Sequence, residues 1–281
     1  MKNILVVGGE GGVGSAFVKM LIERNDNVTV TVLNAKETGK INSLYGAKVP
    51  VYQVDLSDAD RAQSSFTDIV NSMEHLHGVA MCAGYQDIGP AELSPIESYR
   101  NMIEINCLSI MALYKASVSA LRKSKGHFLS ITSTSGLAAM PFVGGYSLSK
   151  YAAEAMMHIL RRESLGQGIR FCSIAPGWIR SPMAASQPIK AKEQLAELSP
   201  DHVSLYGHMF EGFREASSHA YDQNSSTPEE IAQVLIDVLN NSDPEPVIIP
   251  GEEPSKLAGD MSSMSHRELD AIMYKMGREQ T

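Results

Sequence analysis

The segment VVGGEGGVGSAF, residues 6–17, holds five glycines within seven residues. It begins inside the apolar run NILVV at residues 3–7 and leads into the amphipathic run GSAFVKMLIERN at residues 14–25. A buried strand, a glycine-rich turn and a helix in this order are typical of dinucleotide binding. The glycines allow a tight turn, and the helix N-terminus attracts the pyrophosphate. The segment therefore predicts the first strand–turn–helix unit of an α/β fold.

Two glycine spacings overlap in this segment: G-x-G-x-x-G at Gly9, Gly11 and Gly14, and G-x-x-x-G-x-G at Gly8, Gly12 and Gly14. The first spacing requires Asp or Glu at the end of the second strand, about 20 residues on, to hold the ribose hydroxyls. Asn34 stands at that place and Lys36 follows it. The first spacing therefore fails its test for NAD, and the choice depends on residues farther along the chain.

Short apolar runs alternate with longer amphipathic segments along the rest of the chain. Further strands are expected within residues 27–33, 48–56, 78–84, 126–136, 169–177 and 244–251. Near-continuous apolar strands that alternate with helices indicate a parallel sheet covered on both faces. The sequence thus predicts an α/β fold in one domain over residues 1–281.

Two helix starts and one insertion stand out near the C-terminal end. Thr227 with Glu230, and Ser265 with Glu268, have the spacing of a capping box. Residues 183–226 are polar and lack a strand signal, which predicts an irregular insertion, and such insertions are often lids. This one follows the carboxyl end of an expected strand, where α/β sheets bind ligands, so we expect a substrate-binding lid. Residues 252–281 are expected to form a C-terminal extension.

The charge balance argues against several classes of partner. The formal net charge is −8 and no Lys/Arg run occurs, whereas sequence-independent nucleic-acid binding requires phosphate neutralisation. No apolar stretch reaches the ~20 residues needed to cross a bilayer, and the N-terminus lacks the pattern of a signal peptide. We therefore expect a cytoplasmic protein with neither a nucleic-acid nor a membrane partner.

Cysteines and histidines do not predict a metal site or a disulfide framework. Cys82, Cys107 and Cys172 are odd in number, widely spaced and set among apolar neighbours, which indicates reduced core cysteines. His75 and His77 form the sequence HLH without further identifiable ligands, so we interpret them as solvated.

The sequence YSLSK places Tyr146 and Lys150 four residues apart, on one face of a helix. A phenol has an ordinary pKa of about 10, which is poorly suited to proton transfer at neutral pH. A neighbouring ammonium would lower that pKa, and a hydroxyl donor would orient a carbonyl group. Ser133, at the end of the expected strand HFLSITS, lies thirteen residues upstream and is a candidate for this donor.

Further residues occur in a fixed order around this pair: Gly8-x-x-x-Gly12-x-Gly14, Asp55, Ala83-Gly84, Asn106, Ser133, Tyr146-x-x-x-Lys150 and Pro176-Gly177. In this order and spacing, residues 3–250 resemble the short-chain dehydrogenase/reductase family. The resemblance selects the G-x-x-x-G-x-G spacing and implies a Rossmann-type, doubly wound parallel sheet. It also implies an NAD(P)(H)-dependent oxidoreductase that interconverts a secondary alcohol and a ketone or aldehyde.

The resemblance implies a role for each catalytic residue. Tyr146 would donate a proton to a carbonyl oxygen or accept one from an alcohol, and Ser133 would hydrogen-bond the substrate oxygen. Lys150 would lower the pKa of Tyr146 and bind the nicotinamide ribose. Asn106 would hold a water that links Lys150 to solvent.

The resemblance also implies the cofactor contacts. Asp55 and the Leu56 backbone would contact adenine. The residues that would border the nicotinamide are Pro176, Gly177, Ile179 and Ser181. The full expected cofactor set is Gly8, Gly12, Val13, Gly14, Asn34, Lys36, Asp55, Leu56, Ala83, Gly84, Tyr146, Lys150, Pro176, Gly177, Ile179 and Ser181.

Charge complementarity favours NADP over NAD as the cofactor. An acid at Asn34 would repel a 2′-phosphate, and Lys36 adds a nearby cation. Against this, Glu10 adds negative charge to the glycine loop, and Gly11 stands where many NADP-preferring members of the family carry a basic residue. NAD therefore stays open as the alternative.

Departures from the family pattern raise alternative functions. Val7 replaces the usual threonine, and Met81 and Cys82 replace the usual asparagines that brace the backbone around the cofactor. A non-catalytic NAD(P)-binding sensor is the main alternative, although such proteins commonly lose the Tyr or the Lys. An epimerase or dehydratase on the related larger scaffold would usually carry a longer C-terminal domain.

Weaker sequence patterns bear on the size of the substrate and on the oligomeric state of the protein. Met183, Met209, Met261 and Met264 fill packing gaps or line a soft apolar pocket for a bulky alcohol or carbonyl substrate. The helical segments around 100–124 and 147–164 could form the four-helix interface usual in the family. We therefore expect a homodimer or homotetramer.

Overall fold

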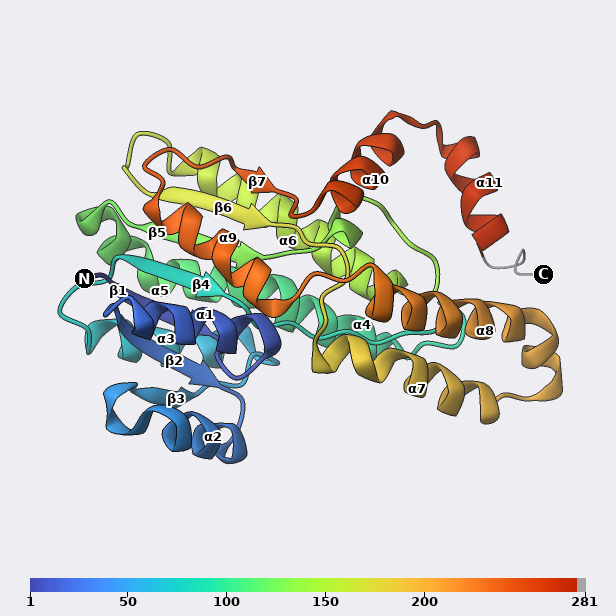
Figure 1. The fold of residues 1–281 in the computed structure, drawn as a ribbon, viewed down its shortest axis with the longest axis horizontal. Helices are drawn as coiled ribbons and strands as arrows, with labels where there is room; N and C mark the ends of the chain where they lie inside the picture. Colours follow the sequence, from blue (N-terminus) through green and yellow to red (C-terminus); the bar gives the residue numbers. More distant parts are fainter. Residues whose placement is uncertain (277–281) are drawn as a thin grey trace.

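Seven parallel strands form the centre of the molecule, in the order β3-β2-β1-β4-β5-β6-β7 (Figure 1). Their bounds are β1 Asn3–Val7, β2 Asn27–Val32, β3 Val51–Gln53, β4 Gly78–Met81, β5 His127–Ile131, β6 Arg170–Ile174 and β7 Val247–Ile248. Strand β1 pairs with both β2 and β4. The chain therefore reverses its direction of travel across the sheet at β1, and α/β sheets bind ligands beyond the carboxyl ends of the strands at such a point. The structure, a computed structural model, describes residues 1–276.

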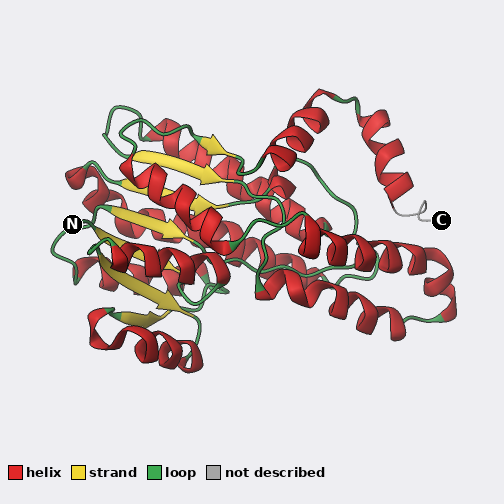
Figure 2. Ribbon diagram, in the orientation of Figure 1, coloured by secondary structure: helices red, strands yellow, loops and turns green. Residues whose placement is uncertain are grey.

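Helices cover both faces of the sheet (Figure 2). The main ones are α1 Gly12–Glu23, α2 Ala35–Tyr45, α3 Ala59–Asn71, α4 Ile96–Ile103, α5 Ser109–Ser124, α6 Gly144–Glu163 and α9 Pro228–Asn240. Buried residues of α1 and α9 pack on one face of the sheet, and those of α3, α5 and α6 pack on the other. The predicted α/β fold in one domain, with a doubly wound parallel sheet, is confirmed.

Four further helices extend from the end of the molecule to which the strand arrows point (Figure 1). They are α7 Pro182–Ala196, α8 Pro200–Gln223, α10 Glu252–Ser263 and α11 His266–Met276. Residues 183–226 are therefore not irregular as expected, because α7 and α8 form a helical hairpin. A serine cap followed by proline starts each helix: Ser181 caps α7 and Ser199 caps α8. This serine–proline signal can be read directly from the sequence, so both helix starts could have been predicted.

The two helix starts predicted from capping pairs are confirmed. Thr227 and Glu230 form a reciprocal capping box at α9. Ser265 and Glu268 form the corresponding pair of contacts at α11. The last five residues of the predicted C-terminal extension, 277–281, lie outside the described residues. Within residues 1–276, no helix has the length and apolar character needed to span a bilayer.

Candidate active site

A cavity of about 1440 Å³ opens between the carboxyl ends of the strands and the helices α7 and α8. The predicted site residues that line it are Gly8, Gly12, Val13, Asp55, Leu56, Ala83, Gly84, Ser133, Tyr146, Lys150, Pro176, Gly177, Ile179 and Ser181. The predicted residues absent from this lining are Gly14, Asn34, Lys36 and Asn106. Tertiary structure thus gathers most of the predicted set around one cavity.

The glycine loop has the shape of a dinucleotide cradle. Gly8 adopts φ 80°, a conformation that L side chains rarely take, and a Cβ there would lie 2.8 Å from the Ala83 backbone. A Cβ at Gly14 would lie 2.1 Å from the Gly8 carbonyl oxygen, so Gly14 is required for the turn rather than for contact with the cavity. Helix α1 begins at Gly12 and turns its N-terminus toward the cavity lining. The loop therefore fits a pyrophosphate.

The end of β2 differs from the expected arrangement. The side chain of Asn34 caps α2 by accepting a hydrogen bond from the Glu37 backbone N–H at 3.1 Å. The Glu37 carboxylate in turn accepts hydrogen bonds from the Leu33 backbone at 2.8 Å and from the Asn34 amide at 3.1 Å. Leu33 and Glu37 line the cavity, whereas Asn34 and Lys36 do not. An acid thus does lie beyond β2, three residues later than the position that the first glycine spacing tests.

A second charged pair borders this end of the cavity. Lys40 of α2 forms an ion pair with Glu10 of the glycine loop, and Glu10 lines the cavity. The Glu10 carboxylate raises the pKa of Lys40. Lys40, rather than Lys36, is therefore the lysine in contact with the glycine loop.

Val7 and Met81, two residues that differ from the family pattern, lie side by side in the sheet. These residues are direct partners in the register of β1 and β4, and both are almost fully buried in the same core cluster. Cys82, the next residue, donates its backbone N–H to the Val7 carbonyl at 2.9 Å. Apolar packing and backbone pairing therefore hold the strand ends where the family uses polar side chains.

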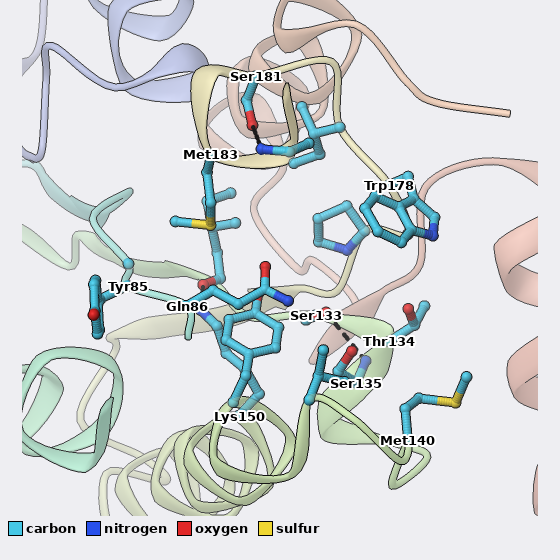
Figure 3. A pocket seen from close by; sticks show the side chains of 18 of the residues that line it. Tyr85, Gln86, Ser133, Thr134, Ser135, Met140, Lys150, Trp178, Ser181 and Met183 are labelled. Atoms are coloured by element: carbon cyan, nitrogen blue, oxygen red, sulfur yellow. Dashed lines mark hydrogen bonds between the residues drawn. The ribbon is translucent and has the colours of Figure 1, made fainter. Parts of the chain in front are cut away.

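Ser133, Tyr146 and Lys150 lie on one wall of the cavity. Ser133 follows β5 and caps a short 3₁₀ turn by accepting a hydrogen bond from the Ser135 backbone at 3.1 Å (Figure 3). Tyr146 and Lys150 lie one turn apart on α6, with the Lys150 Nζ 5.6 Å from the centre of the Tyr146 ring. The buried Lys150 ammonium donates a hydrogen bond to the Ile131 carbonyl at 3.0 Å. Helix α6 thus brings the phenol and the ammonium to the end of β5.

Burial is the largest cause of the pKa shifts of Tyr146 and Lys150. It raises the pKa of Tyr146 to about 12, although a hydrogen bond from Ser133 opposes this shift. It lowers the pKa of Lys150 to about 8, opposed by the charge of Glu154. The pKa of Tyr146 is therefore raised in this structure, not lowered by Lys150 as expected, because desolvation penalises the phenolate.

Asn106 lies behind this wall, in a π-helical segment, Glu104–Leu108, that interrupts the expected long helix between α4 and α5. Its amide oxygen accepts the Tyr85 backbone N–H at 2.8 Å. Its amide nitrogen donates to the Tyr85 carbonyl and to Ser149 Oγ, both at 2.8 Å. These bonds use both amide hydrogens, so the side chain has none left to donate to a water linking Lys150 to solvent.

The opposite wall is apolar and comes from segments without a sequence motif. Trp178 and Met183 lie across the pocket from Lys150 (Figure 3). Further apolar lining residues are Met140 and Phe142 before α6, Leu205, Tyr206, Met209 and Phe213 on α8, and Met261, Met273 and Tyr274 on α10 and α11. Tyr146 packs against the cluster that Phe142 and Phe210 form between this wall and α6. Methionines were the sequence signal for this wall: Met183, Met209 and Met261 line the cavity, one of the two roles considered for them, whereas Met264 does not.

No metal cluster accompanies the site in residues 1–276: no three His, Cys, Asp or Glu side chains are grouped so that they could hold an ion. His77, interpreted as solvated from the sequence, is half-buried and accepts a hydrogen bond from the Asn3 backbone through Nδ1 at 3.0 Å. It therefore ties the start of β1 to the segment before β4.

Comparisons with known proteins agree with this geometry. A family model described as short chain dehydrogenase matches residues 2–192. A 3-amino-tetrahydro-pyrrolizinone reductase of Xenorhabdus hominickii is 26% identical over 271 residues, which cover 96% of this chain and 93% of the relative. A solved short-chain dehydrogenase from Streptomyces avermitilis has a TM-score of 0.76 at 17% identity and covers 98% of this chain and 95% of its own. An alcohol dehydrogenase from Thermococcus sibiricus, complexed with 5-hydroxy-NADP, has a TM-score of 0.69 at 21% identity, with coverages of 89% and 95%.

Proposed function

This chain belongs to the short-chain dehydrogenase family of oxidoreductases, and on that premise we propose that it interconverts a secondary alcohol and a ketone or aldehyde with NADP(H) or NAD(H). The observation that carries this proposal is the convergence of Ser133, Tyr146 and Lys150 on one cavity wall beside the glycine cradle. Proton transfer at a substrate oxygen requires a hydroxyl acid or base within hydrogen-bond reach and a second donor to orient that oxygen.

The residues of the cradle would hold the dinucleotide. Gly8 and Gly12 would let the pyrophosphate approach the backbone at the start of α1, and Asp55 and Leu56 would border the adenine. When bound, the nicotinamide would supply or accept the hydride. Its ring would lie beside Pro176 and Gly177, which line the same cavity.

The catalytic side chains would manage the proton. Tyr146 would donate its phenolic proton to the carbonyl oxygen during reduction, and Ser133 would donate a hydrogen bond to the same oxygen. The Lys150 ammonium would stabilise the phenolate that Tyr146 leaves behind. The raised pKa of Tyr146 keeps the phenol protonated at neutral pH, which suits the reductive direction.

A bulky apolar substrate fits the remaining space. The wall opposite Lys150 carries methionine and aromatic side chains on α7, α8 and α11, and lysine and arginine are absent from the described lining apart from Lys150. Burial of apolar substrate surface would therefore supply most of the binding free energy. The hairpin of α7 and α8 would act as the lid that covers the substrate.

A homo-oligomer is part of this proposal. Helix α6 exposes Leu148, Tyr151 and Ile159, with 52%, 41% and 47% of their surfaces accessible. These residues follow helical spacing and form one apolar face on the outer side of α6. A second copy of the chain would cover this face.

Replacement of Tyr146 by Phe tests the proposed chemistry. The wild-type protein should oxidise or reduce members of a panel of bulky alcohols and ketones, followed by nicotinamide absorbance with each cofactor. Tyr146→Phe should lower kcat by at least about 100-fold, the scale of general acid–base catalysis, and the variant should still bind the cofactor. Equal turnover in the variant, or tight cofactor binding without turnover in the wild type, would reject the proposal, and the latter would favour a sensor.

A further inference from the structure

Lys150 and Glu154 are the only buried charged side chains among the residues whose burial the structure describes. Each is 4% exposed, and no other Lys, Arg, Asp or Glu in that set is buried. The two residues lie four positions apart on α6, which places them on the same face of the helix. A buried charge is costly unless an opposite charge or hydrogen bonds compensate it.

The surroundings of the Glu154 carboxylate offer little other compensation. Oε1 contacts Thr132 Oγ1 at 2.5 Å, and Thr132 directly precedes Ser133. Oε2 is buried and has no hydrogen-bond partner in the described structure. The carboxylate therefore keeps most of its charge uncompensated by hydrogen bonds.

The groups around this carboxylate come from several segments of the chain. Thr132, the residue after β5, has a hydroxyl that also lies 3.1 Å from the Ile174 carbonyl. On strand β6, the thiol of Cys172 lies near enough to feel the charge of Glu154. This thiol stays neutral because burial raises its pKa to about 12. The 3₁₀ turn after β5 contributes Gly136, where a Cβ would lie 3.3 Å from Glu154 Cγ. On α6 itself, Lys150 lies one turn before Glu154, His158 lies one turn after it and Arg161 lies two turns after it, and of these three only Lys150 is buried.

We propose that Glu154 is the counter-ion of Lys150 and a positioning residue of the active site. Its carboxylate, held by Thr132 at the end of β5, keeps the Lys150 ammonium charged where burial opposes the charge. Glu154 does not line the cavity, so it acts through Lys150 and not on the substrate. In agreement, the charge of Glu154 raises the pKa of Lys150 against the effect of burial.

The pairing of the two charges is a property of the fold and can be tested without turnover. The test compares the thermal unfolding midpoints of wild type, Glu154→Gln, Lys150→Met and the double variant. Lys150→Met should lower the midpoint by several degrees more in the wild-type background, where it strands a buried carboxylate, than in the Glu154→Gln background. As a control, the same four-way comparison replaces Glu154→Gln by Glu163→Gln, at an exposed glutamate on α6. The shifts in the unfolding midpoint caused by Lys150→Met and Glu163→Gln should simply add. Additivity at Glu154 as well would overturn the pairing.

The consequence for catalysis rests on the proposed function and has its own readout. In the pH profile of carbonyl reduction, Glu154→Gln should move the basic limb to lower pH by at least about half a unit, because the ammonium loses its proton more easily. Glu154→Asp should restore part of the shift, and Glu163→Gln should leave the limb unchanged. An unchanged limb in Glu154→Gln would overturn the positioning role. Absence of turnover in every variant and in wild type would reject the proposed function, while the unfolding cycle would still decide the pairing.

Discussion

Phe142 meets Phe210 edge to face, with ring centroids 4.7 Å apart and ring planes at 89°. The contact joins the loop before α6 to helix α8. Phe142 also packs against Phe213 at 4.7 Å and holds a left-handed backbone at φ 69°, which is unusual for a bulky residue. Its carbonyl accepts the Gly89 backbone N–H at 2.7 Å. Strain of this kind persists where surrounding contacts over-determine it, often at functional sites.

Phe142→Ala should destabilise the protein by about 2–4 kcal/mol, because it empties a buried aromatic site. Phe142→Gly should be more stable than Phe142→Ala by about 1 kcal/mol, the reverse of the usual order, because glycine adopts the left-handed backbone without strain. Both variants should raise KM for bulky substrates by loosening α8. Denaturant unfolding and steady-state kinetics measure these effects, and an alanine variant more stable than the glycine variant would refute the strain.

Gly8→Ala should weaken cofactor binding and lower stability by about 1–3 kcal/mol, because its Cβ meets the Ala83 backbone in a conformation that alanine rarely adopts. Gly39→Ala is the matched control: it lies inside α2 with open space around its Cβ. This substitution should raise stability by about 1 kcal/mol through helix propensity alone. Fluorescence titration with NADPH measures the change in binding, and chemical unfolding measures the change in stability. Tight NADPH binding by Gly8→Ala would show that the glycine loop does not hold the cofactor.

Carbonyl reduction should slow as the pH rises above about 8. Burial lowers the pKa of Lys150 to about 8, so the ammonium that stabilises the phenolate of Tyr146 is lost as the pH passes through that value. Tyr146, with a pKa raised to about 12, remains protonated throughout and does not set this limb. The dependence of kcat on pH measures the transition. A rate that stays constant to pH 10 would show that the charge on Lys150 is not required.

Glu10→Gln should tighten NADPH binding about two- to fivefold, because it releases Lys40 from its ion pair at the cavity edge. NADH binding should change little, since NADH has no 2′-phosphate. Lys40→Gln should weaken NADPH binding by a similar factor, and added salt should reduce both effects. Fluorescence titration with the two cofactors measures the change. Equal effects on NADH and NADPH would place this ion pair away from the 2′-phosphate.

Tyr151→Glu should dissociate the proposed homo-oligomer, because it places a charge in the centre of the exposed apolar face of α6. Leu44→Glu on α2 is the control, since Leu44 is 69% exposed and lies on a different helix. Light scattering coupled to size exclusion reports the mass of each variant. A monomeric wild-type protein would show that α6 does not associate.

Local sequence signals located most of the site. The glycines before α1 and the capping pairs act within a few residues, so their structural consequences follow from the sequence itself. Tyr146 and Lys150 share a helix face for the same reason. Ser181 and Ser199 carried equally local cap signals for α7 and α8, although the segment as a whole suggested an irregular insertion.

Other features depend on which distant segments meet. Asn34 occupies the predicted place near the end of β2, yet its side chain caps α2 and leaves the cavity edge to Leu33 and Glu37. The packed pair of Val7 and Met81 exists because β1 and β4 are neighbours in the sheet, although the two residues stand 74 positions apart in the chain. No local pattern encodes such a juxtaposition.

The sequence by itself determined the α/β fold, the cradle at Gly8–Gly14 and the Tyr146–Lys150 pair, because turn geometry and helix periodicity act over short distances along the chain. Only the tertiary structure decided what surrounds these groups. Burial between α6 and the sheet shifts the pKa values of Tyr146 and Lys150 and also encloses Glu154. The apolar wall from α7, α8 and α11 likewise arises from packing between segments that are remote in the chain, and packing depends on three-dimensional neighbours that a linear pattern does not specify.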